Sequence, residues 1–296
     1  MSSDWEGLLL LDKPQGITSH DVVDAVRRRT GQRRVGHAGT LDPLATGLLP
    51  LLLGRATRLA RFLPDSPKVY SGRIVLGITT RTDDVEGEVR HRYAGPLPPG
   101  GDVLAAAGEV RRRTEQVPPQ VSARKVGGER SYRLVRKGET VEARATPVTV
   151  SRFDLTPTED PAEWTFEVEV SAGTYVRALA RDLGEALGCG GAVRELRRLR
   201  IGPFDVGSAC AATADLEGRV VPLADIPLSV PSVLLDRASE ALRFSRGVAV
   251  EAPRAGEPQP ATCRVLGPAG QVLGIGDVAS GLLHPRVVLP GPDAAP

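Results

Sequence analysis

The sequence predicts an α+β protein in which helices pack on a largely antiparallel, mixed sheet, followed by a small C-terminal β-barrel-like domain. Residues 164–170 alternate apolar and polar side chains, the period of two that is typical of a half-buried strand. Apolar residues between 176 and 187 recur at helical spacing. From about residue 227 short apolar runs are separated by Gly and Pro, which indicates a small all-β unit.

Start and stop signals place the elements of the first part of the chain. The apolar run 7–11 ends in a Pro- and Gly-containing segment at 12–16, which predicts a buried strand and a turn. Thr18 or Ser19 caps a helix that stops at Gly31. After a loop of small residues at 35–47, we expect a helix near 56–62, a strand at 68–78, a polar turn at 79–87, a breaker cluster at 96–101 and a helix at 103–113.

The apolar residues of segment 117–146 recur neither at the spacing of a helix nor with the alternation of a strand. The segment is charged and contains Pro118-Pro119 and Gly127-Gly128, so we interpret it as a long surface excursion, which in a compact domain is usually functional or mobile. The strand at 164–170 and the helix at 176–187 follow, with Gly188 where a C-terminal cap belongs. The expected domains are therefore 1–226, with an insertion near 117–146, and 227–296.

Composition narrows the class of protein. The chain has 296 residues, with 41% hydrophobic and 25% charged residues, as is ordinary for a soluble globular protein. Its three cysteines and four histidines are scattered, so we expect no disulfide framework, no metal and, without a nucleotide-binding Gly motif, no cofactor. No run of about 18 apolar residues and no secretory signal is present, which predicts a cytoplasmic protein without a membrane partner.

Positive charge gathers locally although the formal net charge is only +2. Nearly all of it is arginine, which suits phosphate recognition and stacking on bases, so a nucleic-acid partner is one interpretation. The alternative is that an Arg-, Ala- and Pro-rich composition reflects the genome. The clusters are Arg27-Arg28-Arg29 with Arg33-Arg34, Arg111-Arg112-Arg113, and Arg194 with Arg197-Arg198 and Arg200.

The segment 36–47 concentrates three glycines, His37 and Asp42 within a dozen positions. Glycines permit close approach of the backbone to a ligand, so such loops often border a site. Two simpler interpretations stand beside this one. Asp42 precedes Pro43, a pair that favours a helix N-cap with proline in the first position, and a lone loop histidine is often a packing or hydrogen-bonding residue.

This loop resembles the catalytic motif of the bacterial tRNA pseudouridine-55 synthases (TruB type), and further motifs of that family follow in the same order. Together the motifs resemble the family over about residues 7–205, and several in order are far more specific than one. They are Gly7-Leu-Leu-Leu-Leu-Asp-Lys-Pro-Gln-Gly16, Asp65-Ser-Pro-Lys-Val-Tyr70, Ala172-Gly-Thr-Tyr-Val-Arg177, Asp182-Leu-Gly-Glu-Ala-Leu-Gly-Cys-Gly190 and Val193-Arg-Glu-Leu-Arg-Arg-Leu199.

The resemblance implies the pseudouridine synthase fold and a role for each matching residue. Asp42 matches the essential aspartate, Arg177 the arginine that pairs with it, and Tyr70 the tyrosine that stacks on the target base. His37, Tyr175 and Leu196 match positions that line the nucleotide pocket. The chemistry agrees, because one ionised carboxylate can act as nucleophile or base without a metal, and an arginine neighbour favours that ionised form.

The resemblance also implies a substrate and RNA-binding parts. The implied activity is isomerisation of uridine 55 in the T arm of tRNA, with the uridine flipped out of the loop. Residues 117–146 resemble an RNA-binding insertion, although Val121 stands where an aromatic residue is common and Lys125 and Tyr132 fit better. Residues 227–296 resemble weakly a PUA-like RNA-binding domain. We expect a monomer without protein partners.

Two other functions remain open at this point. One is a non-catalytic tRNA-binding or tRNA-folding module on the same scaffold, which would not need Asp42, Tyr70 and Arg177 together. The other is a synthase for a different RNA, guided by a partner. The self-contained set of an insertion and a C-terminal domain favours a stand-alone enzyme. Tyr70 and Tyr175 also have the simpler interpretation of core packing.

Overall fold

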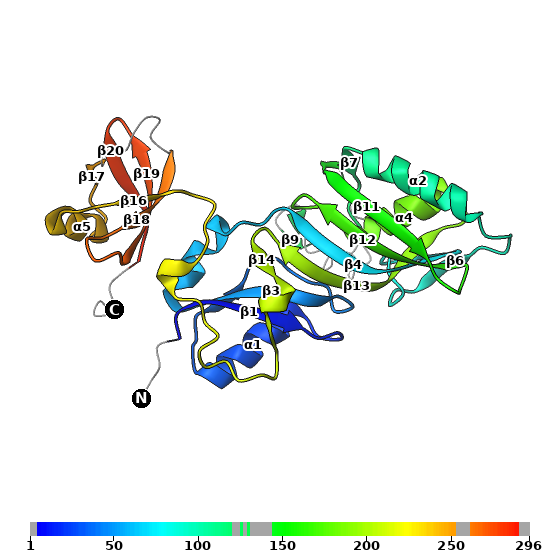
Figure 1. Cartoon of the computed structure of the whole chain (residues 1–296), viewed down its shortest axis with the longest axis horizontal. Helices are drawn as coiled ribbons and strands as arrows, with labels where there is room; N and C mark the ends of the chain where they lie inside the picture. The colour runs from blue at the N-terminus through cyan, green and yellow to red at the C-terminus, as the bar shows by residue number, and fades with distance from the viewer. Residues whose placement is uncertain (1–4, 120–124, 127–128, 131–143, 253–260, 290–296) are drawn as a thin grey trace.

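A computed structural model describes residues 5–119, 125–126, 129–130, 144–252 and 261–289. Figure 1 shows a long curved sheet with helices along it and a separate small sheet at one end of the molecule. This confirms the predicted α+β class with a small C-terminal β unit. Among the described helices, none is long and apolar enough to cross a membrane.

The large sheet is mixed and mostly antiparallel. Only the pairs β13–β3 and β1–β15 are parallel in the described sheet. Its strands lie in the order β11 (Val150–Pro157), β12 (Glu163–Val170), β4 (Lys68–Leu76), β13 (Gly191–Ile201), β3 (Thr46–Leu53), β1 (Gly7–Lys13) and β15 (Cys210–Ala211), with β14 (Phe204–Asp205) beside β13 and β2 (Val35–His37) beside β3.

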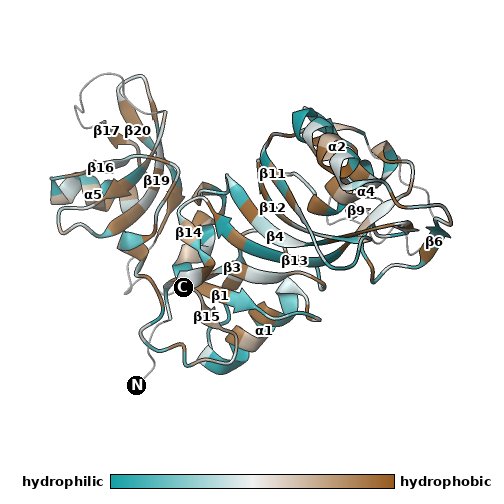
Figure 2. Ribbon diagram, turned by 45° about the vertical axis from the view of Figure 1, so that its right-hand side comes forward, coloured by the Kyte–Doolittle hydropathy of each residue, from teal (hydrophilic) through white to brown (hydrophobic). Residues whose placement is uncertain are grey.

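Three helices pack on this sheet in the described part of the chain. They are α1 (Ser19–Thr30), α2 (Gly100–Arg112) and α4 (Val176–Ala186). Figure 2 shows each with hydrophilic and hydrophobic residues on different sides, and the hydrophobic ones belong to the main core. Helix α1 begins and ends as predicted: Thr18 forms a capping box with Asp21, and Gly31 closes the helix at a positive φ of 69°.

Short elements complete the first 226 residues. The helix expected near 56–62 is a 3₁₀ helix, η1 (Gly54–Phe62). The pairs β5 (Ile78–Thr80) with β6 (Val89–Arg92), and β7 (Glu115–Gln116) with β10 (Thr146–Pro147), form two-stranded ribbons. The remaining short elements are β8 (Lys125–Val126), β9 (Glu129–Arg130), η2 (Val206–Ser208) and η3 (Leu223–Asp225).

The predicted insertion leaves the larger unit at β7 and returns to it at β10. Most of it, including Val121 and Tyr132, lies outside the described residues. Its expected mobility and RNA contacts stay predictions.

The C-terminal unit is a curled five-stranded sheet with its own core around Phe244. The apolar runs at 264–266 and 272–275 lie within strands, the run at 287–289 covers the end of a strand, and the run at 247–250 reaches a strand only at Val250. The helix α5 (Ala238–Ser245) and the first strand of this unit were not expected. The strand order is β16 (Ser232–Leu234), β18 (Thr262–Leu266), β19 (Val272–Ala279), β20 (Leu282–Val288) and β17 (Val250–Glu251).

This unit packs against η1 of the larger one. Leu59 and Phe62 of η1 share a buried apolar cluster with Val272 and Ile275 of β19. The guanidinium of Arg286 lies 5.7 Å from the centre of the Phe62 ring, within range of a cation–π contact. The two units thus meet through a packed interface as well as through the connecting chain.

Candidate active site

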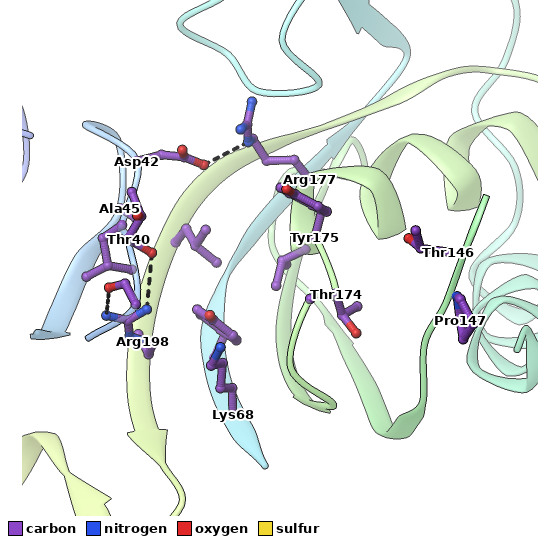
Figure 3. Close-up of a pocket in the computed structure, with 16 residues that line it drawn as sticks. Thr40, Asp42, Ala45, Lys68, Thr146, Pro147, Thr174, Tyr175, Arg177 and Arg198 are labelled. Carbon is purple, nitrogen blue, oxygen red and sulfur yellow. Dashed lines mark hydrogen bonds and ion pairs between the residues drawn. The ribbon is translucent and has the colours of Figure 1, made fainter. Parts of the chain in front are cut away.

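A pocket of about 470 Å³ opens where the loop before β3 faces β4, β13 and the start of α4. Figure 3 shows side chains from all these elements around it. Its lining includes five of the six predicted site residues, which come from distant parts of the sequence. The lining residues used below are Gly39, Thr40, Asp42, Lys68, Tyr70, Thr146, Pro147, Tyr175, Arg177, Leu196 and Arg198.

Asp42 and Arg177 form an ion pair across the mouth of this pocket. The Arg177 Nε lies 2.9 Å from the Asp42 Oδ2. The Arg177 side chain is only 6% exposed, whereas that of Asp42 is 40% exposed. The pair therefore joins a buried, fixed cation to a carboxylate that is held on one side and open to the pocket on the other (Figure 3).

A second carboxylate holds Arg177 from behind. Its Nη1 donates to the Thr82 carbonyl oxygen at 2.6 Å and lies 3.4 Å from the Asp84 Oδ2. Asp84 is buried and also accepts hydrogen bonds from the Thr82 hydroxyl at 2.6 Å and from the Glu86 amide at 3.2 Å. Arg177 can thus present Nε to Asp42 in a fixed direction, because its far end is already occupied.

The backbone beside Asp42 is fixed from helix α1. The Ser19 hydroxyl donates to the Leu41 carbonyl at 3.1 Å and accepts from the Leu41 amide at 2.8 Å. The Asp42 carbonyl accepts from the Ala45 amide at 3.1 Å, which makes a turn, and no helix begins there. The alternative of Asp42 as a helix N-cap is therefore not what this loop does.

A buried lysine supports the same turn from the other side. Lys13 is 0% exposed, and its Nζ donates to the carbonyls of Pro14 at 2.9 Å, Ile17 at 2.7 Å and Pro43 at 3.4 Å. Burial lowers the pKa of Lys13 to about 8, although attraction to Asp42 opposes this.

Arg198 links the Asp42 loop to the sheet. It is almost fully buried, and its guanidinium donates to the carbonyls of Leu48 at 2.8 Å, Thr40 at 3.2 Å and Gly39 at 3.0 Å. Burial lowers the pKa of Arg198, and attraction to Tyr70 and Asp42 opposes the shift. The residue thus holds the loop as a cationic brace below the pocket.

Strand register places Tyr70 next to this brace. Arg198 of β13 lies opposite Tyr70 of β4 on one side and Gly47 of β3 on the other. Gly47 has a φ of +98°, and a Cβ there would come 2.3 Å from the Arg198 carbonyl oxygen. A glycine is therefore required at this crossing, which lets β3 and β13 approach directly after the Asp42 loop.

The remaining predicted residues take two different positions. Leu196, buried on β13, and Tyr175, at the start of α4, both line the pocket. His37 ends strand β2 opposite Leu51 and is half-buried, but it is not among the residues that line this pocket.

Sequence reasoning did not single out Lys13, Ser19, Asp84 or Arg198 as site residues. Lys13 and Arg198 lie inside segments that carry the family resemblance, which was the signal available for them. Nothing in the local pattern of Ser19 or Asp84 sets them apart from ordinary capping and turn residues, because their partners are distant in sequence.

The arginines of the third cluster all make contacts within the protein, and their predicted contacts to phosphate stay a prediction. Arg198 is buried, and the other three members pair with carboxylates: Arg194 with Glu163 at 2.7 Å, Arg197 with Asp12 at 2.6 Å and Arg200 with Glu169 at 2.8 Å. Figure 2 shows this middle part of β13 as hydrophilic along the sheet.

Sequence comparison identifies two matching family domains. Residues 27–176 match the N-terminal domain of the TruB family pseudouridylate synthases, and residues 177–223 match the C-terminal domain of tRNA pseudouridylate synthase B. The protein named tRNA pseudouridine synthase B of Thermobifida fusca is 44% identical over 97% of this chain and 99% of its own length. The protein of the same name from Mycobacterium tuberculosis is 46% identical over 71% of each chain.

Solved structures agree on the fold. A chain in the crystal structure of a Cbf5–Nop10–Gar1 complex superposes with a TM-score of 0.70 at 24% identity, covering 96% of this chain and 85% of its own. A chain in an H/ACA ribonucleoprotein bound to a substrate RNA containing 2′-deoxyuridine gives 0.70 at 21% identity, with 100% and 93% covered. Together with the family match, this confirms the predicted pseudouridine synthase fold.

Proposed function

This chain belongs to the TruB family of pseudouridylate synthases, and from that premise we propose that it isomerises uridine 55 in the T loop of tRNA to pseudouridine. The relatives named as tRNA pseudouridine synthases align with nearly the whole chain, which supports tRNA as the substrate class. The observation that carries the proposal is the Asp42–Arg177 pair at 2.9 Å at the pocket described above.

The reaction needs little beyond one carboxylate and a shaped pocket. The N1–C1′ bond of the uridine breaks, the base turns and a C5–C1′ bond forms, while C5 loses its proton and N1 gains one. Asp42 is the group we assign to this exchange, as a nucleophile toward sugar or base or as a proton acceptor, since its open side faces the pocket. Arg177 holds the carboxylate in one orientation through its Nε contact, and no cofactor enters the proposal.

The pocket walls suit a nucleoside whose base has left the RNA stack. Tyr70 supplies an aromatic surface for the base, and Leu196 and Tyr175 provide the neighbouring wall. A uridine inside a folded loop has to be flipped out to reach them, which costs a few kcal/mol. His37 is assigned to the space that the base vacates, on the basis of its motif position.

The charges of the pocket favour a substrate that carries phosphate. Its lining includes the cations Lys68, Arg177 and Arg198 and the single carboxylate of Asp42. Burial lowers the pKa of Lys68 and repulsion from Arg198 lowers it further, whereas Asp65 acts in the opposite direction. An incoming phosphate would relieve this repulsion, so we assign Lys68 to the nucleotide backbone.

The other parts of the chain receive auxiliary roles in this proposal. Residues 1–226 form the catalytic domain, the insertion near 117–146 grips the T arm, and residues 227–296 form a PUA-like domain that binds the rest of the tRNA. We propose that the protein acts in the cytoplasm as a monomer. A protein without residues 227–296 should then show a raised KM for whole tRNA and a smaller change for a T-arm stem-loop.

The test is to map pseudouridine after incubating the purified protein with an unmodified tRNA transcript. We expect pseudouridine at position 55 and none in a transcript in which uridine 55 is replaced by cytidine. Pseudouridine only at another site, or only in another RNA, would favour a synthase with a different target. Tight tRNA binding without any pseudouridine would favour the non-catalytic binding module.

A further inference from the structure

Two hydrogen bonds tie the base of the insertion to the helix that carries Arg177. Gln116 lies in β7 and is only 3% exposed. Its Oε1 accepts from the Tyr175 amide at 2.8 Å, and its Nε2 donates to the Tyr175 carbonyl at 3.1 Å. One contact needs an acceptor and the other a donor, so both are satisfied in a single orientation of the side-chain amide.

Tyr175 is the N-cap residue of α4, and no side chain caps the helix at this position. Its carbonyl also accepts from the amides of Ala178 at 3.1 Å and Leu179 at 3.3 Å. The Gln116 amide therefore fixes both polar groups of the residue at which the helix begins. We call these two hydrogen bonds between Gln116 and Tyr175 the clamp. Arg177 lies two residues further on, in the first turn of α4, so the clamp determines the position of that turn.

The clamp belongs to the pocket as well as to the insertion. Gln116 pairs with Thr146 in the β7–β10 ribbon, and the Thr146 hydroxyl donates to the Gln116 carbonyl at 3.3 Å. Thr146 and its neighbour Pro147 line the pocket, and Figure 3 shows them on the far side of Tyr175 from Asp42. The ribbon thus meets the pocket wall at Tyr175.

Other contacts hold the middle of α4. Arg181 donates to the Val117 carbonyl at 2.8 Å, and Arg113 lies 3.1 Å from the Asp182 carboxylate. These bonds attach residues one turn beyond Arg177, whereas Gln116 attaches a residue that touches the pocket. Loss of the Gln116 bonds should therefore disturb the site more than loss of these contacts.

We propose that Gln116 is a positioning residue for the isomerisation: its side-chain amide sets the backbone of Tyr175, and thereby the Tyr175 ring and the Arg177 guanidinium, for the chemical step. The inference rests on the proposed function, since that reaction supplies its readout. A purely structural Gln116 would change the folded fraction and leave the rate per folded molecule unaltered.

The test compares Gln116→Leu with Val110→Ala in the full-length protein. Val110 is fully buried on α2, so its truncation lowers stability without touching the clamp. We expect Gln116→Leu to lower the single-turnover rate at saturating tRNA by about 10- to 100-fold, with the tRNA Kd within about threefold of wild type. Val110→Ala should keep the rate within about twofold at a comparable loss of Tm.

A second variant gives a signature that a structural role would not produce. Gln116→Glu keeps an acceptor for the Tyr175 amide, but its ionised form cannot donate to the Tyr175 carbonyl. A protonated carboxyl can donate, so the ratio of the Gln116→Glu rate to the wild-type rate should rise as the pH falls from about 8 to about 5.

Three results would overturn the proposal. The first is a saturating rate of Gln116→Leu within about twofold of wild type. The second is a loss of rate in Gln116→Leu that matches the loss in Val110→Ala at equal Tm. The third is a ratio of the Gln116→Glu rate to the wild-type rate that does not change with pH. A wild-type protein that forms no pseudouridine in tRNA defeats the proposed function itself and this role for Gln116 with it, an outcome distinct from the others.

Discussion

Arg177 donates to Asp42 through Nε, while its Nη1 is already bound to Thr82 and Asp84. A guanidinium can make these contacts at once because its donors point in different directions within one plane. A lysine has a single ammonium group on a flexible chain, so it cannot bind Asp42 on one side and Thr82 and Asp84 on the other in the same fixed geometry. The pair therefore depends on arginine itself and not simply on positive charge.

Arg177→Lys should lower kcat by roughly 100-fold with little change in KM, since the carboxylate loses its fixed partner while the pocket walls remain. Steady-state kinetics on a tRNA transcript measures both constants. Arg200→Lys is the matched control, because Arg200 pairs with Glu169 away from the pocket. A lysine variant with wild-type kcat would contradict a specific pairing role for Arg177.

Asp84→Asn should reduce kcat by about tenfold, because Arg177 keeps the Thr82 carbonyl but loses a buried counter-charge. The adjacent Asp83 is a close control. It pairs with Arg181 at 3.2 Å instead, and its φ of 60° is a conformation that asparagine tolerates. Equal losses in Asp84→Asn and Asp83→Asn would show that the effect does not pass through Arg177.

Lys68→Met should raise KM by about tenfold and leave kcat nearly unchanged, since a phosphate contact contributes uniform binding. Its binding to tRNA should also depend less steeply on salt than that of wild type, because each lost phosphate contact reduces counterion release. Lys68→Arg should retain most of the affinity. If Lys68→Met and wild type share one KM and one salt slope, Lys68 does not contact the RNA backbone.

Lys13 predicts a pH dependence of stability whose sign can be worked out. Its pKa is lowered from 10.5 to about 8 in the folded protein, so the unfolded chain holds that proton more tightly. Charged Lys13 therefore opposes folding below pH 8, and this cost disappears as the pH rises from about 8 to 10.5.

The stability of wild type relative to Lys13→Met should consequently increase across that window, by at most about 1.4 kcal/mol per pH unit. Urea unfolding of both proteins at several pH values gives this difference. Tyrosines and cysteines titrate in both proteins, so their contribution drops out of the comparison. A difference that stays constant between pH 8 and 10.5 would show that Lys13 does not titrate there.

Much of the fold could be predicted because its signals are local. The cap at Thr18, the stop at Gly31 and the alternation at 164–170 each act within a few residues, and the corresponding α1 and β12 are present. Helix α5 was missed because it has only eight residues and no side-chain cap at Arg237. The 3₁₀ geometry of η1 likewise leaves no mark in the hydrophobic pattern.

The site was predictable only where a motif carried it. Asp42 and Arg177 were assigned as a pair from resemblance, and they lie 2.9 Å apart. Asp84 acts on Arg177 across 93 positions, and Ser19 holds Leu41 across 22, contacts that no local spacing encodes. The burial of Arg198 could not be read from a run of arginines, because solvated and buried arginines look alike in sequence.

The most direct test of the central claim is the single-turnover rate of Asp42→Asn on a tRNA transcript, measured together with its Kd for that tRNA. Asparagine keeps the size of the side chain but supplies no carboxylate to the pocket. We predict no detectable pseudouridine, with the Kd within about threefold of wild type, and full activity in Asp24→Asn on the exposed side of α1. A folded Asp42→Asn protein that turns over within about tenfold of the wild-type rate would contradict the assignment of Asp42 as the catalytic group.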